Sequence, residues 1–345
     1  MDLREQRFGI EVEMTGITRK KAAEVAAEYF GSQSQHLGTC YDTYAVVDNQ
    51  GRQWKFVRDR SIQPQKKLDG HKICATSFYR TELVSPICTY EDILSIQELI
   101  RKLREHGAFT NQSCGIHVHI DASPFDAQKL RNLTNLFASK EDLIYKALDV
   151  SVERRHRWCQ PMNQRFVEEL NRKRPISMHD MERIWYNGPS RSECHYDSSR
   201  YHCLNLHSVF QKGTIEFRLF NGTLHAGKIK AYLQFCLAIG AQAYNQRSAS
   251  RKKTQTNNEK YTFRTWLLRL GLNGEEFATA RYHLLANLEG CIAWRDPKQA
   301  EEQKERIKQK KEKERLQTEQ IENREFVQEI EDSEIEETST FVMQM

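Results

Sequence analysis

The sequence predicts an α+β fold with a largely antiparallel, curved sheet flanked by helices. Segments of alternating apolar and polar residues, typical of half-buried strands, are interleaved with amphipathic segments typical of helices. The strands are joined by hairpin-like connections rather than by the regular helical crossovers of βαβ units. Charge divides the chain, because residues 1–297 carry a net charge of +10 and residues 298–345 carry −5. We therefore expect a basic globular body with an acidic, charged helical or disordered C-terminal tail.

The first half of the body contains five predicted strands and two predicted helices. Residues 7–14 alternate as a half-buried strand does. The turn at residues 48–51 predicts a hairpin between the strands on either side of it. Gly31 and Gly107 are expected to end the two helices. The predicted strands are residues 7–14, 44–47, 54–57, 80–84 and 115–120, and the predicted helices are residues 20–30 and 91–106.

The second half is less regular. Residues 126–147 predict a helix or a helix pair, whereas residues 150–200 predict an irregular or lid-like insertion. Two further strands are expected at residues 201–210 and 214–220, followed by a long apolar helix at residues 227–245. The domain prediction is a catalytic domain over residues 1–245, a polar loop and helical end-piece over 246–297, and the tail over 298–345.

Composition excludes several classes of protein. No segment has the roughly 18–20 consecutive apolar residues of a membrane helix, and the N-terminus lacks a signal-peptide pattern. The nine cysteines are odd in number and none are spaced as CxxC, which argues against a disulfide framework and a structural zinc site. The sequence therefore predicts a cytoplasmic protein with reduced thiols and no membrane partner.

Two predicted strands carry paired polar side chains on one face. Glu11 and Glu13 are two residues apart, so their carboxylates point to the same side of the strand. His117 and His119 repeat this spacing on another strand. Parallel carboxylates repel unless a cation lies between them, so a hard divalent ion is one interpretation. An ordinary solvated strand face is the other interpretation.

Two more strands add charged pairs of the same kind. Glu216 and Arg218 share one face of their strand, as do Arg80 and Glu82. Each pair taken alone could be a simple ion pair, and Asp59 and Ser61 could be simple turn formers. Together, the strands would line a groove with Glu11, Glu13, Glu82, His117 and Glu216. Four carboxylates and an imidazole suit Mg²⁺ or Mn²⁺ better than Zn²⁺.

The polar strands, in this order along the chain, resemble a known family. The chain is similar to the putative amidoligase family, within the glutamine synthetase and glutamate–cysteine ligase superfamily of carboxylate–amine ligases. The resemblance covers scattered segments of residues 7–240 and leaves residues 246–345 uncovered. Its motifs are Phe8–Glu13, Asp59–Ser61, Thr81–Pro86, Cys114–Asp121 and Gly213–Arg218 leading into Asn221. The last two motifs are the most specific.

The resemblance implies a glutamine-synthetase-like catalytic fold and roles for individual residues. Glu11, Glu13 and Glu82 would bind metal, and His117 and Glu216 would hold the metal beneath the nucleotide phosphates. Arg218 would stabilise the transferring phosphoryl group. Weaker support assigns a catalytic role to Asp59, nucleotide contacts to His119 and Arg80, and substrate contacts to Ser61, Asn205 and Asn221.

The resemblance also implies the chemistry. Such enzymes use ATP and Mg²⁺ or Mn²⁺ to phosphorylate a carboxylate, and an amine then attacks the acyl phosphate to form an amide or peptide bond. The expected substrates are an acid and an amine drawn from amino acids, peptides or cell-wall precursors.

Two alternative functions stay open at the level of sequence. A metal-dependent hydrolase could use the same carboxylates with His117 and His119 but without ATP. A nucleic-acid-binding protein could use the basic body, including residues 154–157 and 251–253, although these runs lack interleaved aromatic residues. The acidic tail has two interpretations as well, a flexible arm for a protein partner or a solvated helix without one.

Overall fold

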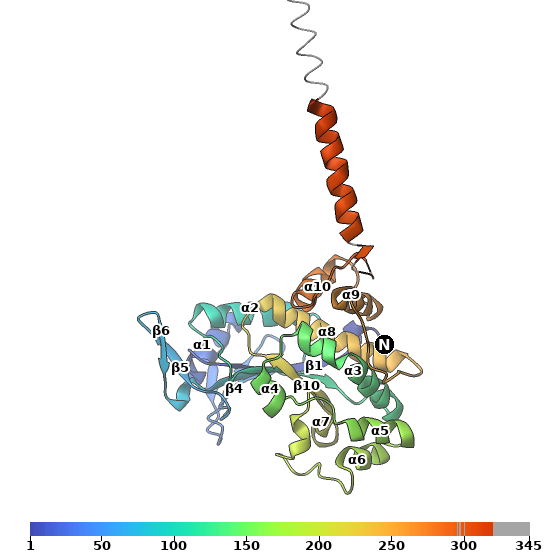
Figure 1. The fold of residues 1–345 in the computed structure, drawn as a ribbon. Helices are drawn as coiled ribbons and strands as arrows, with labels where there is room; N and C mark the ends of the chain where they lie inside the picture. Colours follow the sequence, from blue (N-terminus) through green and yellow to red (C-terminus); the bar gives the residue numbers. More distant parts are fainter. Residues whose placement is uncertain (295, 297, 300, 320–345) are drawn as a thin grey trace, which may run out of the picture.

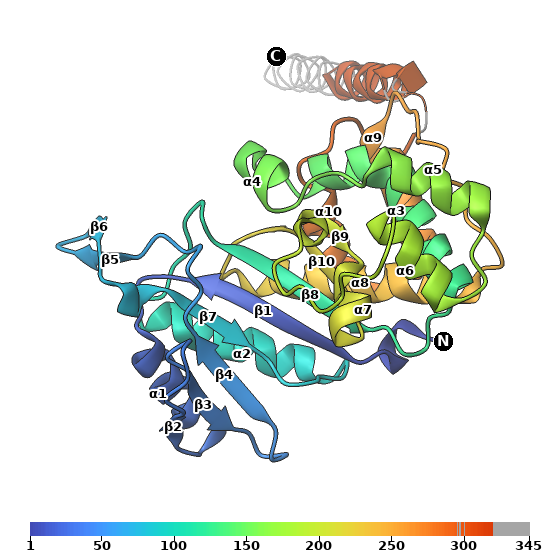
Figure 2. The same ribbon diagram turned by 90° about the horizontal axis from the view of Figure 1, so that it is seen from below.

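The sheet of this protein has eight antiparallel strands and lies at the centre of the body (Figure 1). The structure is a computed structural model that describes residues 1–294, 296, 298–299 and 301–319. The strand order is β2-β3-β4-β7-β1-β8-β10-β9, so the first long strand of the sequence is a central strand. A separate hairpin, β5-β6, projects from the body beside the end of β1, where the Gly16 amide donates to the Gln65 carbonyl oxygen (Figure 2).

The strands have the following bounds. The main sheet consists of β1 (Phe8–Met14), β2 (Ser34–His36), β3 (Tyr44–Val47), β4 (Gln53–Val57), β7 (Thr81–Val84), β8 (Gly115–Asp121), β9 (Leu204–Asn205) and β10 (Thr214–Asn221). The separate hairpin consists of β5 (Gln65–Leu68) and β6 (His71–Cys74).

Helices lie on both sides of the sheet (Figure 1). The α-helices are α1 (Arg19–Phe30), α2 (Asp92–Glu105), α3 (Ala127–Ala147), α4 (Val152–Arg157), α5 (Gln164–Lys173), α6 (Met178–Tyr186), α7 (His207–Lys212), α8 (Ala226–Asn245), α9 (Glu259–Arg269) and α10 (Ala278–Leu285). Short 3₁₀ turns lie at Leu3–Glu5, Ser77–Tyr79, Ser198–Tyr201 and Glu275–Phe277. Helices α1, α2 and α8 lie together on one side of the sheet (Figures 1 and 2).

Alternation along the strands separates the core from the polar face. On β1, Ile10, Val12 and Met14 are buried among the helices, and on β8, Ile116 and Val118 are buried in the same way. The residues between them point away from these helices because successive side chains of a strand alternate. The opposite face of β1, β8 and β10 is left for polar side chains.

Most of the predicted elements are confirmed. The hairpin turn at residues 48–51 closes with the Gly51 amide donating to the Asp48 carbonyl oxygen over 2.9 Å. Thr18 caps α1 by accepting a hydrogen bond from the Lys21 amide, and Gly31 ends the helix in the left-handed conformation. Residues 126–147 form one helix, α3, rather than a pair, and residues 227–245 lie in α8.

Residues 201–210 differ from the prediction of a strand. Only Leu204 and Asn205 pair with β10, and the chain then forms α7, which ends at Gly213 with φ +71°. The alternation of apolar residues was a misleading signal here. Strand β9 is at the edge of the sheet, and the segment after it packs as a helix whose Val209 is buried.

Residues 150–200 also differ from the prediction, because they contain three helices rather than irregular chain. Helices α4, α5 and α6 are six, ten and nine residues long and are rich in charge. Each buries only a few side chains, including Phe166 and Leu170 on α5. Helices α5 and α6 are nevertheless amphipathic, so the sequence carried a helical pattern here that the prediction missed. Whether this segment acts as a lid, and whether the domain boundaries are as predicted, stay predictions.

Two short features of the first half were not predicted. Strand β2 extends the sheet beyond β3, and the β5-β6 hairpin is exposed along most of its length. Within the described part of the chain, no helix has both the length and the apolar character needed to span a bilayer. The nine cysteines, all of which the structure describes, form no disulfide.

Residues 301–319 are helical and exposed at every position, and this helix stands away from the body in Figure 1. The predicted disordered end of the tail lies outside the described residues.

Candidate metal and nucleotide site

The polar face of four neighbouring strands gathers the predicted site residues. Strand register places Glu11 of β1 opposite His117 of β8, and Glu13 of β1 opposite Glu82 of β7. On the other side of β8, His119 lies opposite Glu216 of β10. These six residues span more than 200 positions of the sequence, so only the pairing of the strands brings them together.

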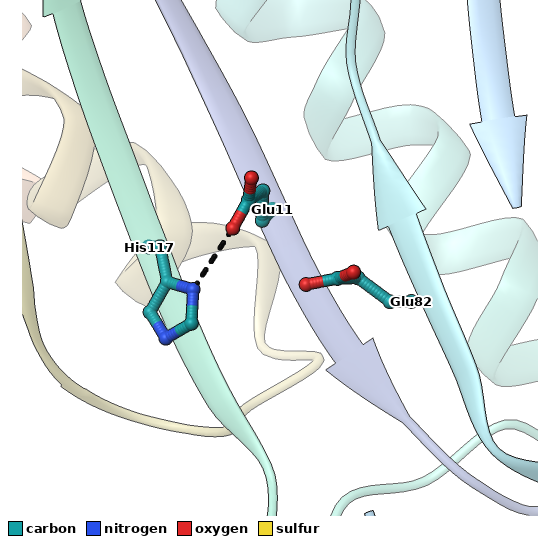
Figure 3. Close-up of side chains that lie close together, drawn as sticks. All are labelled: Glu11, Glu82 and His117. Carbon is teal, nitrogen blue, oxygen red and sulfur yellow. Dashed lines mark hydrogen bonds and ion pairs between the residues drawn. The ribbon is translucent and has the colours of Figure 1, made fainter. Parts of the chain in front are cut away.

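The first group that could hold a cation consists of Glu11, Glu82 and His117. One ligand atom from each lies within 4.8 Å of the others. Figure 3 shows the three side chains turned toward one another from β1, β7 and β8. Nδ1 of His117 lies 2.9 Å from a carboxylate oxygen of Glu11, which orients the imidazole.

A second group shares Glu11 and adds His119 and Glu216. Nε2 of His119 lies 3.4 Å from Oε1 of Glu11 and 3.9 Å from Oε1 of Glu216. That nitrogen is buried and forms no hydrogen bond with any described residue, whereas Nδ1 contacts the Thr214 hydroxyl at 3.0 Å. A buried ring nitrogen with no partner beside two carboxylates is suited to bind a cation.

A third group shares Glu82 and adds Glu13 and Asp59. A carboxylate oxygen of Glu13 accepts a hydrogen bond of 2.6 Å from the Gly115 amide. Asp59 lies in the loop after β4 and accepts a bond of 2.6 Å from the Ser61 amide, as in an ordinary turn. The shared residues Glu11 and Glu82 therefore connect three groups into one continuous row.

Glu216 is held from two sides. Arg218, two residues along the same strand, forms an ion pair with it, and both side chains are buried. Nδ2 of Asn205 on β9 donates to the other carboxylate oxygen over 2.6 Å. A bulge in β10 between Phe217 and Phe220 shifts the register, so that Phe220 lies opposite Ile116 on the apolar face.

The pKa values of the carboxyl groups are raised at one end of the row and lowered at the other. Burial raises the pKa of Glu13 to about 8, helped by the charge of Asp59, and burial with the charge of Glu11 raises the pKa of Glu82 well above its ordinary value. Burial also acts on Glu216, but the Arg218 guanidinium lowers its pKa to about 2. The pKa of Glu11 is held well below its ordinary value by His119 and His117, against the effect of burial.

The two histidines shift in opposite directions. Burial lowers the pKa of His117 to about 4, and the charge of Arg218 acts in the same direction. Burial acts on His119 as well, but the neighbouring Glu11 and Glu216 carboxylates raise its pKa. His117 is therefore a neutral imidazole at neutral pH, which is the form that binds a metal.

The donor set of the row fits hard divalent cations. Five carboxylates, from Glu11, Glu13, Asp59, Glu82 and Glu216, converge there with two imidazoles. Oxygen-rich sets of this kind suit Mg²⁺ or Mn²⁺, whereas zinc sites favour thiolates and imidazoles in a closed tetrahedron. The neighbouring guanidiniums do not balance this charge, so bound cations would offset the repulsion between the carboxylates.

Arg218 and Asn205 bind these groups through Glu216, whereas the side chains of three other predicted site residues form no hydrogen bond with them. Ser61 contributes its amide to Asp59, and its own side chain contacts no member of the row. Arg80 lies just before β7, where its carbonyl oxygen accepts from Arg19 over 2.8 Å and its own Nε is buried without a partner among the described residues. Asn221 uses its side chain to bind the turn before α4, through the Asp149 carbonyl oxygen at 2.6 Å and the Ser151 amide at 3.1 Å.

One residue of this region was missed from the sequence. Arg154 on α4 is only 3% exposed, whereas Arg155, His156 and Arg157 beside it are exposed. Its guanidinium lies against Gly115, at the end of the row occupied by Glu13. The basic run at residues 154–157 is therefore not a uniform surface patch, and nothing in its composition marks which arginine is buried.

A cavity of about 300 Å³ opens at the opposite end of the row. Glu11, His119 and Thr214 are among the residues that line it. Lys212 adds positive charge, Arg7 forms an ion pair with Asp121 in the same lining, and Pro86 and Ile87 supply apolar surface. A hollow lined by a cation, apolar surface and a carboxylate–imidazole pair suits a phosphorylated ligand with a planar base.

The comparisons with known proteins agree with this geometry. Residues 4–240 match a family model described as putative amidoligase enzyme, which covers every residue of the carboxylate–histidine row and ends within α8. A search of curated proteins found no match for the chain.

Proposed function

The chain belongs to the putative amidoligase family, and on that premise we propose that it is an ATP-dependent ligase that joins a carboxylate to an amine through an acyl phosphate. Family membership implies a ligase and the use of ATP. The observation that supports the proposal most directly is the row of three overlapping groups on one sheet face, which share Glu11 and Glu82. Phosphoryl transfer needs such an array because charge must be held at both sides of the transferring group.

We assign Mg²⁺ or Mn²⁺ to the row. Glu11, His119 and Glu216 would hold the ion nearest the cavity, with His117 beside them, and Glu13, Asp59 and Glu82 would hold one at the other end. Bound there, the ions would draw charge from the phosphate oxygens of ATP and position them. Asn205 keeps Glu216 oriented through the 2.6 Å hydrogen bond.

ATP is assigned to the cavity beside Glu11 and His119. Lys212 offers a cation for the phosphates, and the apolar surface at Ile87 offers contact for the base. The γ-phosphate would then lie toward the centre of the row, within reach of Arg218. The guanidinium of Arg218 would stabilise charge on the transferring phosphoryl group.

The proposed reaction has two chemical steps. A carboxylate oxygen of the acid attacks the γ-phosphorus, the bond to the β–γ bridging oxygen breaks, and ADP leaves with the electron pair. The amine nitrogen then attacks the acyl carbon, the C–O bond to phosphate breaks, and the nitrogen loses a proton. The products are an amide, ADP and inorganic phosphate.

The first test is ADP release in the presence of Mg²⁺ or Mn²⁺, with pools of amino acids and small peptides as acids and amines. We expect release that requires an acid and rises with an amine. Glu216→Ala should reduce it by at least about 100-fold, because both the cation site and the ion pair with Arg218 are lost. Glu98→Ala, an exposed carboxylate on α2, is the matched control and should leave release unchanged.

Two results would contradict the proposal. Turnover that persists in a folded Glu216→Ala protein would remove the row from the chemistry. Metal-dependent cleavage of an amide or ester without ADP formation would favour the alternative of a metal-dependent hydrolase that uses the same carboxylates.

A further inference from the structure

Arg154 reaches the site from α4, in a segment that the sequence linked only to the nucleic-acid-binding alternative. Helix α4 is fixed to the end of β10, because the Asn221 side chain accepts from the Ser151 amide over 3.1 Å and donates to the Asp149 carbonyl oxygen over 2.6 Å. Ser151 then caps α4 by accepting from the Arg154 amide. The position of Arg154 is therefore set by β10, the strand that carries Glu216 and Arg218.

The Arg154 guanidinium is buried near the Glu13 carboxyl group, whose pKa its charge lowers against the larger effect of burial. Its Nη2 donates to the Arg218 carbonyl oxygen over 3.0 Å, but its Nε has no hydrogen-bond partner, and it forms no salt bridge with any residue that the structure describes. A buried cation with an unused donor is costly unless an anion is bound beside it.

The absence of a side chain at Gly115 leaves space for this guanidinium. A Cβ atom added to Gly115 would lie 2.3 Å from Nη1 of Arg154, so the arginine occupies the space that any larger residue would fill. Gly115 is the first residue of β8, and His119 at the cavity lies four residues further on. At about 3.3 Å per residue, Arg154 lies roughly 13 Å along the strand from the cavity assigned to ATP.

We propose that Arg154 binds the oxyanion of the acid substrate, either its carboxylate or the phosphoryl group attached to it, at the end of the row opposite ATP. This inference rests on the proposed function, because that function defines which end receives the acid. The acid would then lie between Arg154 and Arg218, with the transferred phosphoryl group toward the centre of the row. The segment at residues 150–200 would thereby contribute directly to recognition of the acid.

The test measures oxyanion binding rather than turnover, since the acid itself is unidentified. Inorganic phosphate is titrated by calorimetry in the presence of Mg²⁺ and ADP, and acetate is titrated by NMR with Mg²⁺ and a non-hydrolysable ATP analogue. Arg154→Ala should weaken one or both by about 10- to 100-fold, the effect of losing a charge-assisted hydrogen bond, while ADP affinity stays constant. Loss of phosphate binding alone would assign the phosphoryl group, and loss of acetate binding would assign the carboxylate.

Two further variants separate this role from a structural one. Arg155→Ala removes an exposed arginine from the same helix and should change neither affinity. Gly115→Ala keeps Arg154 but displaces its guanidinium, so it should weaken oxyanion binding in the wild-type background and have no further effect in Arg154→Ala. Gly115→Ala also serves as the decisive variant if Arg154→Ala does not fold.

The outcomes distinguish this inference from the proposed function. Unchanged phosphate and acetate affinities in folded Arg154→Ala or Gly115→Ala would overturn the inference alone. A wild-type protein that binds ADP but neither oxyanion would also overturn it alone. A wild-type protein that binds no ADP with Mg²⁺ or Mn²⁺ would overturn the proposed function and the inference with it.

Discussion

Glu13 carries the clearest pH-dependent consequence at the scale of single residues. Burial and the neighbouring Asp59 raise its pKa from an ordinary value of 4.5 to about 8 in the folded protein. The folded state therefore holds this proton more tightly than the unfolded state does. The resulting stabilisation is fully present below about pH 4.5 and is lost as the pH rises through 8. The raised pKa of Glu82 acts in the same direction.

We therefore expect the metal-free protein to lose thermal stability between about pH 4.5 and pH 8. Glu13→Gln is neutral in both states and should show a smaller loss over the same range. The measurement is Tm in a chelator at a series of pH values, for wild type and variant. Parallel curves for the two proteins would show that Glu13 does not titrate in this range.

The strand residues of the site could be predicted individually, because the two faces of a strand can be told apart from its own sequence. Glu11, Glu13, His117 and Glu216 alternate with apolar residues, so their common side of the sheet follows from spacing alone. Arg154 could not be predicted in this way. Its burial depends on a glycine 39 positions earlier, and four basic residues in a row give no sign of which one turns inward.

At the scale of elements, Gly16 connects the end of β1 to the β5-β6 hairpin. Its amide donates to the Gln65 carbonyl oxygen over 2.9 Å, and it has φ +83°. An added Cβ would lie 2.4 Å from the carbonyl oxygen of Gly107 and from the Phe109 ring. Gly31 also has a positive φ, +64°, but an added Cβ there would meet no atom within 4 Å.

These two glycines form a matched pair for a stability measurement. Gly31→Ala should cost about 1–2 kcal/mol, the expense of a left-handed conformation for a residue with a side chain. Gly16→Ala should cost an additional 1–3 kcal/mol or so, because backbone atoms must move to admit the methyl group. Urea unfolding of both variants checks the difference, and equal losses would mean that the contacts around Gly16 yield without cost.

The long strands and long helices were predicted well, whereas the short elements in the second half of the body were not. The strands β1, β8 and β10 have clear alternation, and α2 and α8 have clear helical patterns. The alternation at residues 201–210 misled because only two residues there pair with the sheet. Helices α5 and α6 do carry an amphipathic pattern, with Phe166, Val167 and Leu170 buried on α5, so the sequence held a helical signal there that the prediction missed. Helix α4 buries only Arg154 and has no such pattern.

At the scale of the whole molecule, the tail is separable from the site. Residues 301–319 are exposed at every position, and the family match ends at residue 240. Deletion of residues 298–345 should leave Tm and ADP release unchanged, because no buried surface of the described tail is lost. Thermal unfolding and the ADP assay check this together. Reduced ADP release at unchanged Tm would instead indicate a functional role for the tail.

The central position of β1 has a consequence for synthesis on the ribosome. This strand is completed by residue 14, but one of its neighbours, β8, ends only at residue 121, and β10 ends at residue 221. At 5–20 residues per second, roughly 5–20 s separate β1 from β8. During that interval the apolar side of β1 lacks part of its final surroundings. The nascent chain then exposes apolar surface of the kind that chaperones bind. A polypeptide released before residue 214 would lack β10, and with it Glu216 and Arg218, however well its first half had folded.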